Sequence, residues 1–162
     1  MIALNPNVTN IDDVRRALQA IKMHFDRLTA YGSLYRVGAT TQTIGGTFQK
    51  VLGYDTNGPA QGTTPDKANG RITVEHSGRY LVLVDMGLLT EGSAGGVTIE
   101  GRKNGVAIPG CVTRFYVNTE ERAGSVSAIV DCEAGDYIEV YATGSGATFT
   151  FICCNLTVHR VG

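Results

Sequence analysis

The C-terminal segment 135–162 constrains the fold of this chain more than any other stretch. It contains a Gly-Asp turn, a strand over 138–142, a Gly-Ser-Gly turn and one long strand that runs almost to the end. Apolar side chains occupy both faces of that last strand: Ile152, Cys154, Leu156 and Val158 on one, and Phe149, Phe151 and Cys153 on the other. The strand predicted over 79–86 is similar, with Leu81 and Leu83 opposite Tyr80, Val82 and Val84. A strand that is apolar on both faces has packing partners on both faces. One face can line the core of a sheet sandwich, and we expect the other to contact a second copy of the chain.

Residues 47–162 are predicted to form strands connected by turns. Turn-forming residues recur roughly every 8 to 15 residues, and no helical periodicity appears after residue 32. Asn104 and Gly105 predict a type I′ hairpin turn. Long exposed loops are expected over 55–69 and 87–96, which lack apolar periodicity. The pattern is typical of an all-β sandwich or barrel, and about eight strands favour a jelly roll.

A helix is predicted near the N-terminus. Thr9 or Asn10 supplies the N-cap, and Asp12 and Asp13 lie in the first turn, where the helix dipole favours negative charge. Apolar residues then recur at alternating steps of three and four, the spacing of a coiled coil; we call them the helix seam: Ile11, Val14, Leu18, Ile21, Phe25 and Leu28. The narrow stripe favours a coiled coil between chains, with three or more helices. The alternative is an amphipathic helix that lies on its own domain.

The sequence divides into three parts. The helix is expected to end near Gly32, a residue type that commonly follows a helix C-terminus. Residues 33–46 are polar and rich in glycine and threonine, and they predict a linker. We therefore expect a tail and helix (1–32) that trimerises or anchors the chain, a linker (33–46) and a jelly-roll domain (47–162).

Charge and composition exclude several function classes. The net charge of −1 sets up no field that would attract nucleic acid or an anionic membrane. No apolar run approaches the roughly 20 residues that span a bilayer, and no secretory signal is recognised at the start, so folding in a cytoplasm is expected. The four cysteines are expected to be reduced and buried, although a disulfide between Cys111 and Cys132 is the alternative.

Catalytic and metal-binding patterns are not recognised, so neither an enzyme nor a cofactor is expected. The three histidines, His24, His76 and His159, are predicted in a helix, a turn and the chain end, without the spacing of a catalytic or metal site. Calcium binding through loop carboxylates is a weaker alternative that no ligand spacing supports; its candidates are Asp55, Asp66 and Asp131.

Three short motifs carry a resemblance to a known superfamily. Residues 70–80 contain GRITV followed by Gly-Arg-Tyr, residues 103–105 are Lys-Asn-Gly, and residues 134–140 are AGDYIEV. In order and spacing, over roughly residues 47–160, they resemble the jelly roll of the tumour necrosis factor and complement globular-head superfamily. The resemblance implies a compact homotrimer packed about a three-fold axis by aromatic and aliphatic residues of the inner sheets. The aromatic residues expected in such an interface are Tyr137, Tyr141, Phe149 and Phe151.

A helix almost at residue 1, without a collagen-like stalk, is similar to small trimeric proteins of bacteriophage virions, such as head fibres, capsid decoration proteins and tail-fibre knobs. The resemblance implies a structural protein on the virion surface, whose N-terminal segment attaches to the major capsid protein or another virion component. The alternative is a receptor-binding tip module that recognises a host glycan or protein through loops 55–69 and 87–96. The absence of tryptophan, which is typical of sugar sites, favours the structural role.

Overall fold

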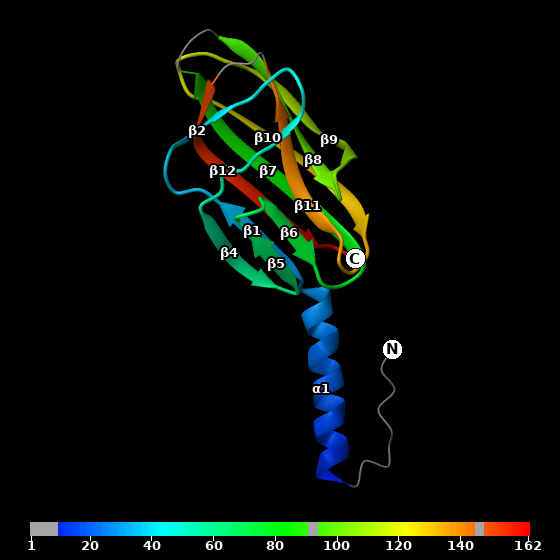
Figure 1. Ribbon diagram of the computed structural model, residues 1–162. Coiled ribbons are helices and arrows are strands. Elements are labelled where there is room, and N and C mark those ends of the chain that lie inside the picture. Colours follow the sequence, from blue (N-terminus) through cyan, green and yellow to red (C-terminus); the bar gives the residue numbers. More distant parts are fainter. Residues whose placement is uncertain (1–9, 91–93, 145–147) are drawn as a thin grey trace.

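A helix and two antiparallel sheets make up the computed structural model, which describes residues 10–90, 94–144 and 148–162. The helix is α1 (Ile11–Leu28). Sheet A has the strand order β10-β7-β12-β1-β4, with β2 on β12; sheet B has the order β5-β6-β11-β8-β9, with β3 on β11. The two sheets face one another as a sandwich (Figure 1).

The chain crosses between the two sheets several times. Their bounds are β1 (Tyr31–Tyr35), β2 (Thr40–Thr43), β3 (Gln49–Lys50), β4 (Thr56–Gln61), β5 (Thr63–Asp66), β6 (Arg71–Val74), β7 (Gly78–Thr90), β8 (Gly95–Lys103), β9 (Val106–Val117), β10 (Arg122–Cys132), β11 (Tyr137–Thr143) and β12 (Thr148–Arg160).

The core lies between the sheets and follows from alternation along their central strands. On β7 one face is buried; it carries Tyr80, Val82, Val84, Met86 and Leu88. Sheet B supplies the opposing buried side chains, among them Val97, Ile99, Ile138 and Val140. Burying an aliphatic or aromatic side chain of this size contributes about 1.5–3 kcal/mol relative to leaving it exposed. The hydroxyl of the buried Tyr80 is hydrogen-bonded: it donates to the His76 carbonyl at 2.8 Å.

The hairpin predicted at Asn104 and Gly105 is confirmed. Both residues have positive φ, 51° and 82°, as a type I′ turn requires, and they join β8 to β9.

The prediction that the last strand is apolar on both faces is wrong. The pairing of β12 with β7 shifts register between Phe151 and Cys153, which leaves Ile152 as the extra residue of a bulge. An extra residue turns the following side chains by one step. Phe149 and Phe151 therefore share one buried face with Cys154, Leu156 and Val158, while Cys153 is exposed.

The predicted linker over 33–46 is also wrong. Most of β1 and the whole of β2 lie in it, and both strands pair with β12. Leu34 is buried in the core, and Gly32, expected just past the helix, lies inside β1. A side chain at Gly32 would collide with Thr63, whose hydroxyl donates to the Tyr31 carbonyl at 2.5 Å. The close approach of β5 accounts for a glycine there.

The two predicted long loops are largely strands. Residues 55–69 contain β4 and β5, which meet at Gly62 with a φ of 60°. Both are edge strands with few buried side chains, so they lack the apolar alternation by which strands are recognised. Of the stretch 87–96, residues 87–90 belong to β7 and residues 95–96 to β8; 91–93 fall outside the described residues.

Candidate self-association surfaces

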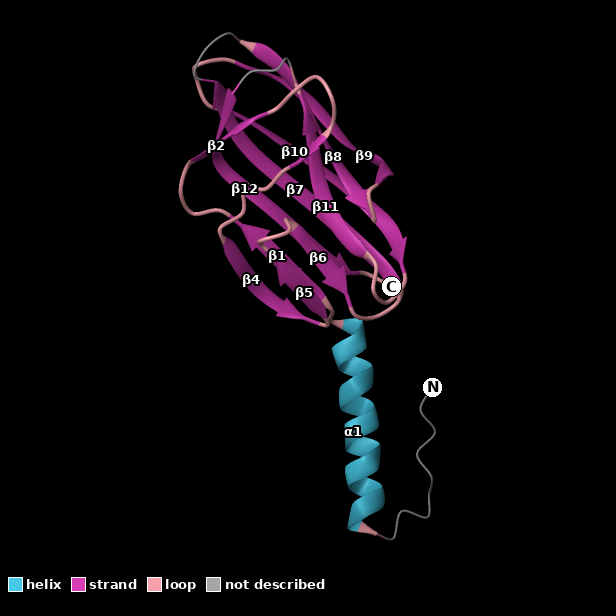
Figure 2. Ribbon diagram, viewed as in Figure 1, coloured by secondary structure: helices cyan, strands magenta, loops and turns pink. Residues whose placement is uncertain are grey.

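Helix α1 projects from one end of the sandwich and does not lie along it (Figures 1 and 2). Its start is fixed as predicted: the Asn10 side chain accepts a hydrogen bond from the Asp12 amide at 3.1 Å. Ion pairs from Asp12 to Arg15 and from Asp13 to Arg16 support the first turns. Because α1 projects away from the sandwich, the alternative of an amphipathic helix that lies on its own domain is wrong.

The helix seam faces solvent in the single chain. Ile11, Leu18 and Phe25 are 67%, 59% and 60% exposed, Val14 is exposed, and Ile21 is half-buried. The side chain of Leu28 lies outside the described residues. A helix with an apolar stripe normally buries it, so a stripe held away from its own domain indicates a surface for another chain.

The predicted jelly-roll interface residues divide into two pairs. Phe149 and Phe151 are 0% exposed, because the bulge in β12 turns them into the core of their own chain. They offer no surface to a second copy, so their assignment to an interface is wrong. Tyr137 and Tyr141 lie on the outer face of sheet B, where the guanidinium of Arg71 covers Tyr137 and that of Arg102 covers Tyr141. The structure does not bring either pair together with the helix seam.

A second exposed apolar surface lies on the outer face of sheet A. Leu81 of β7 pairs with Ile129 of β10 on one side and with His159 of β12 on the other. His159 in turn pairs with Tyr31 of β1, so these residues form a row across the sheet. Leu83 is next along β7 on the same face, and it, Ile129 and Tyr31 are exposed. We call Tyr31, Leu81, Leu83, Ile129 and His159 the sheet A patch. Leu81 and Leu83 were recognisable in the sequence as the second apolar face of their strand.

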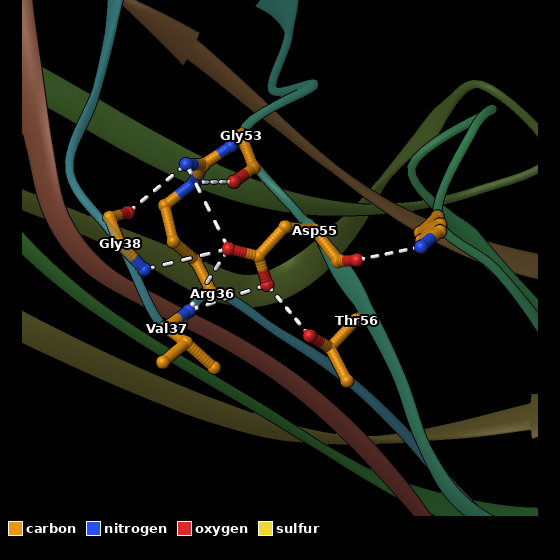
Figure 3. Close-up of polar contacts among 7 residues, drawn as sticks. Arg36, Val37, Gly38, Gly53, Asp55 and Thr56 are labelled. Atoms are coloured by element: carbon orange, nitrogen blue, oxygen red, sulfur yellow. Dashed lines mark hydrogen bonds and ion pairs between the residues drawn. The ribbon is translucent and has the colours of Figure 1, made fainter.

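Asp55, a candidate calcium ligand, is engaged in a structural clamp (Figure 3). Its carboxylate accepts hydrogen bonds from the Thr56 hydroxyl at 2.7 Å and from the amides of Val37 and Gly38. Arg36 lies 3.9 Å from the same carboxylate and donates to the Gly53 and Gly38 carbonyls. The Thr56 hydrogen bond, with those amides and Arg36, outweighs desolvation and holds the pKa of Asp55 below its ordinary value. The clamp fixes the segment between β1 and β2.

The other candidate calcium ligands have partners of their own. Asp66 accepts hydrogen bonds from Asn69 and pairs with Arg71. Asp131 of β10 pairs with Arg79 of the neighbouring strand β7. Within residues 10–90, 94–144 and 148–162, no three His, Cys, Asp or Glu side chains gather where they could hold a metal ion.

The four cysteines are free thiols, and burial distinguishes them. Cys111, Cys132 and Cys154 are buried, as predicted, but Cys153 is exposed at the bulge. Burial raises the pKa of the Cys132 thiol to about 11 and that of Cys154 to about 12. These two thiols stay protonated at neutral pH and behave as small apolar side chains.

A polar pocket of about 350 Å³ lies at the end of the sandwich from which α1 leaves. It is lined by Glu75, His76, Ser77, Ala134 and Arg160. Ser77 Oγ accepts a hydrogen bond from the Ala134 amide, and Glu75 accepts one from Thr64. These contacts fix the segments that line the pocket.

Among the described residues, no helix is long and apolar enough to span a bilayer.

Comparison with known proteins gives a match in structure and none in sequence. No family model matches the chain, and a search of curated protein sequences finds no relative. Three solved structures share its fold at 12–14% sequence identity: Eiger TNF from S. frugiperda (TM-score 0.58), the PRD1 vertex protein P5 (0.60) and murine APRIL (0.53). The matches cover 82–83% of this chain and 92%, 99% and 99% of those chains. The chain therefore has the tumour-necrosis-factor-like jelly-roll fold, which it shares with the PRD1 vertex protein P5.

Proposed function

We propose that this chain is a structural protein of a bacteriophage virion, a homotrimeric capsid decoration or fibre protein. Its N-terminal segment attaches to the particle, through the major capsid protein or another virion component, and its jelly roll forms the projecting head. The observation that carries the proposal is the exposed helix seam on a helix held off the end of the sandwich. The likeness in fold to the PRD1 vertex protein P5 supports it.

Self-association follows from the energetics of the seam. Each seam side chain that moves from water into a contact between helices gains about 1.5–3 kcal/mol when it becomes fully buried. An amphipathic helix such as α1 takes most of its stability from packing of its apolar face. Association through the seam would therefore stabilise α1 and cover its apolar stripe in the same step.

The first test is the solution mass of the purified chain. We expect a species at three times 17.2 kDa by native mass spectrometry or light scattering. Leu18→Asp, which places a charge in the seam, should lower the mass to that of one chain. Met23→Asp is the matched control, because Met23 is an equally exposed apolar residue of α1 outside the seam. A wild-type monomer would overturn the homotrimer.

The second test concerns attachment. Removing residues 1–28 takes away the helix and leaves Ala30, which is buried and accepts a hydrogen bond from the Arg160 amide. The truncated chain should stay folded by circular dichroism and no longer bind virions in a co-sedimentation assay. If it still bound them, the N-terminal attachment would be wrong. A specific hit on a glycan array would instead favour a receptor-binding tip.

A further inference from the structure

The polar pocket at the α1 end of the sandwich lies between the ends of the two sheets. Arg160 is the last residue of β12 in sheet A, and Glu75 directly follows β6 of sheet B. Arg160 continues the alternation of Val158, which is buried in the core, so its side chain is directed between the sheets. The volume of about 350 Å³ is within the range of roughly 300–1,000 Å³ that is typical of small-molecule sites.

The wall of this pocket carries one carboxylate and one guanidinium. Glu75 Oε1 accepts a hydrogen bond from the Thr64 hydroxyl at 2.8 Å, which leaves Oε2 as an acceptor. Within the part of the chain that the structure describes, Glu75 forms no ion pair with Arg160. A guanidinium has five N–H donors, so Arg160 can hold a carboxylate in addition to its contacts within the protein. Two opposite charges therefore line the same space from separate positions.

The polar groups of the pocket are held in place by the protein itself. Arg160 lies against the backbone of Gly78, where any side chain would collide with the Arg160 guanidinium. Ser77 Oγ accepts a hydrogen bond from the Ala134 amide at 3.1 Å, so the Ser77 hydroxyl proton can be donated to a ligand. Groups that are already positioned lose little conformational freedom when a ligand binds, which favours binding.

We propose that this pocket binds a small zwitterion that carries an ammonium group and a carboxylate, namely a free α-amino acid. The ammonium group pairs with the Glu75 carboxylate, and the ligand carboxylate accepts hydrogen bonds from the Arg160 guanidinium and the Ser77 hydroxyl. A ligand with a single charge would place that charge beside a like charge of the wall, and an apolar ligand would desolvate both charges without replacing their hydrogen bonds to water. The inference goes beyond the proposed virion role and does not depend on self-association.

The first test compares matched ligands on the unmodified full-length protein. L-Alanine is titrated while amide NMR spectra are recorded, and we expect the signals of Ser77 and Ala134 to shift. Ethylamine lacks the carboxylate of alanine and propionate lacks its ammonium group, so each should bind about tenfold or more weakly. Glucose, which has hydroxyls and no charge, should not shift these signals. The pocket assignment is overturned if alanine shifts neither signal, if either single-charge analogue binds as tightly as alanine, or if glucose binds in its place.

Substitutions then assign the two charges. Glu75→Gln and Arg160→Gln each remove one charge, and each should raise the Kd for alanine by about tenfold or more. Glu133→Gln is the matched control for the carboxylate, because Glu133 precedes Ala134 but does not line the pocket. Circular dichroism checks that each variant is folded; if Arg160→Gln is not, Glu75→Gln and the ligand analogues still decide. Equal losses for Glu75→Gln and Glu133→Gln would contradict the site.

The same titration in the Leu18→Asp chain separates this inference from the proposed function. Leu18 lies on α1 outside the pocket, so the variant should bind alanine like the wild type whether or not it dissociates. A wild-type monomer that binds alanine would overturn the homotrimer and support the pocket. A trimer that does not bind alanine would overturn the pocket alone.

Discussion

At the scale of single residues, Asp55 shows how a polar side chain can define a backbone path. The sequence gives no apolar reason for residues 36–38 to lie beside residues 53–56, and the contact is made by one carboxylate and one guanidinium. A carboxylate that accepts hydrogen bonds from two amides and a hydroxyl has little capacity left for a cation. The same contacts explain why its pKa is low, since each favours the charged form.

This clamp makes part of the stability dependent on pH. The folded-state pKa of Asp55 is below that of the unfolded chain, so its contribution is complete above the ordinary aspartate pKa of about 4 and is lost as the pH falls through the folded value. Asp55→Asn should lower the free energy of unfolding at pH 7 and lose less of it between pH 7 and pH 3 than the wild type. Urea unfolding at both pH values measures this. Asp131→Asn, whose side chain is highly exposed, should keep the wild-type dependence.

Phe151 provides a second prediction at this scale. Because the side chain is fully buried in its own chain, Phe151→Ala should lower the free energy of unfolding by about 3–5 kcal/mol. Tyr141→Ala, on the partly exposed outer face of sheet B, should cost about 1 kcal/mol or less. Both are best measured by urea unfolding in the Leu18→Asp background, where association does not add to stability. Equal losses for the two variants would contradict this assignment of Phe151 to the core.

At the scale of elements, the sequence predicts best the segments that have a regular apolar period. The start of α1, the exposed seam on the helix, the hairpin at Asn104 and the central strands follow from spacing and turn chemistry. Strands β1, β2, β4 and β5 were missed because they are short or lie at an edge, and their sequences are governed by neighbouring strands more than by a buried face. No local feature of the sequence predicts the bulge in β12 either, since its position is set by the pairing of β12 with β7.

The bulge can be tested by deletion. Removing Ile152 leaves Phe149, Phe151, Cys154, Leu156 and Val158 in strict alternation, so each can keep its place in the core. Removing Thr157 instead turns Val158 outward and His159 inward. The second deletion should therefore cost at least about 2 kcal/mol more of the free energy of unfolding than the first. Urea unfolding of the two variants under the same conditions decides this; equal costs would mean that Ile152 is not the inserted residue.

At the scale of the whole molecule, the fold is a property of the arrangement of buried and exposed positions more than of particular residues. Solved structures only 12–14% identical to this chain share its fold, and neither a family model nor a curated sequence matches the chain. The sequence does not predict every surface through which copies would contact one another, because these surfaces depend on which faces the folded chain leaves exposed. The helix seam was apparent from its spacing, whereas Phe149 and Phe151 could be assigned to the core only once the register of β12 with β7 was known.

The proposed assembly has parallel helices. In an antiparallel pair, Arg15 of one helix would lie near Lys22 of the other, whereas a parallel pair sets Lys22 beside Ala17. Ile11→Cys, in a Cys153→Ser background, should therefore form a disulfide between chains rapidly on mild oxidation, as measured by non-reducing electrophoresis. In an antiparallel pair residue 11 would lie opposite residue 28, about 25 Å from its counterpart.

Two controls separate the orientations. Met23→Cys, which lies outside the seam, should cross-link slowly in the same background. A mixture of Val14→Cys and Phe25→Cys chains should form few mixed disulfides. Rapid formation of the mixed product would show that the helices run antiparallel.

The positions of the chain ends determine where the protein can carry an added peptide. The C-terminal segment ends beside the base of α1, where the Arg160 amide donates to the Ala30 carbonyl at 2.8 Å. A tag fused after Gly162 would hang next to the helices and compete with whatever they bind. The turn at Gly45 and Gly46 lies beside Thr143, at the other end of β11, and a side chain at Gly46 would meet no atom within 4 Å. An epitope inserted there would be presented at the far tip of the sandwich, which makes this turn the natural site for cargo on a display scaffold.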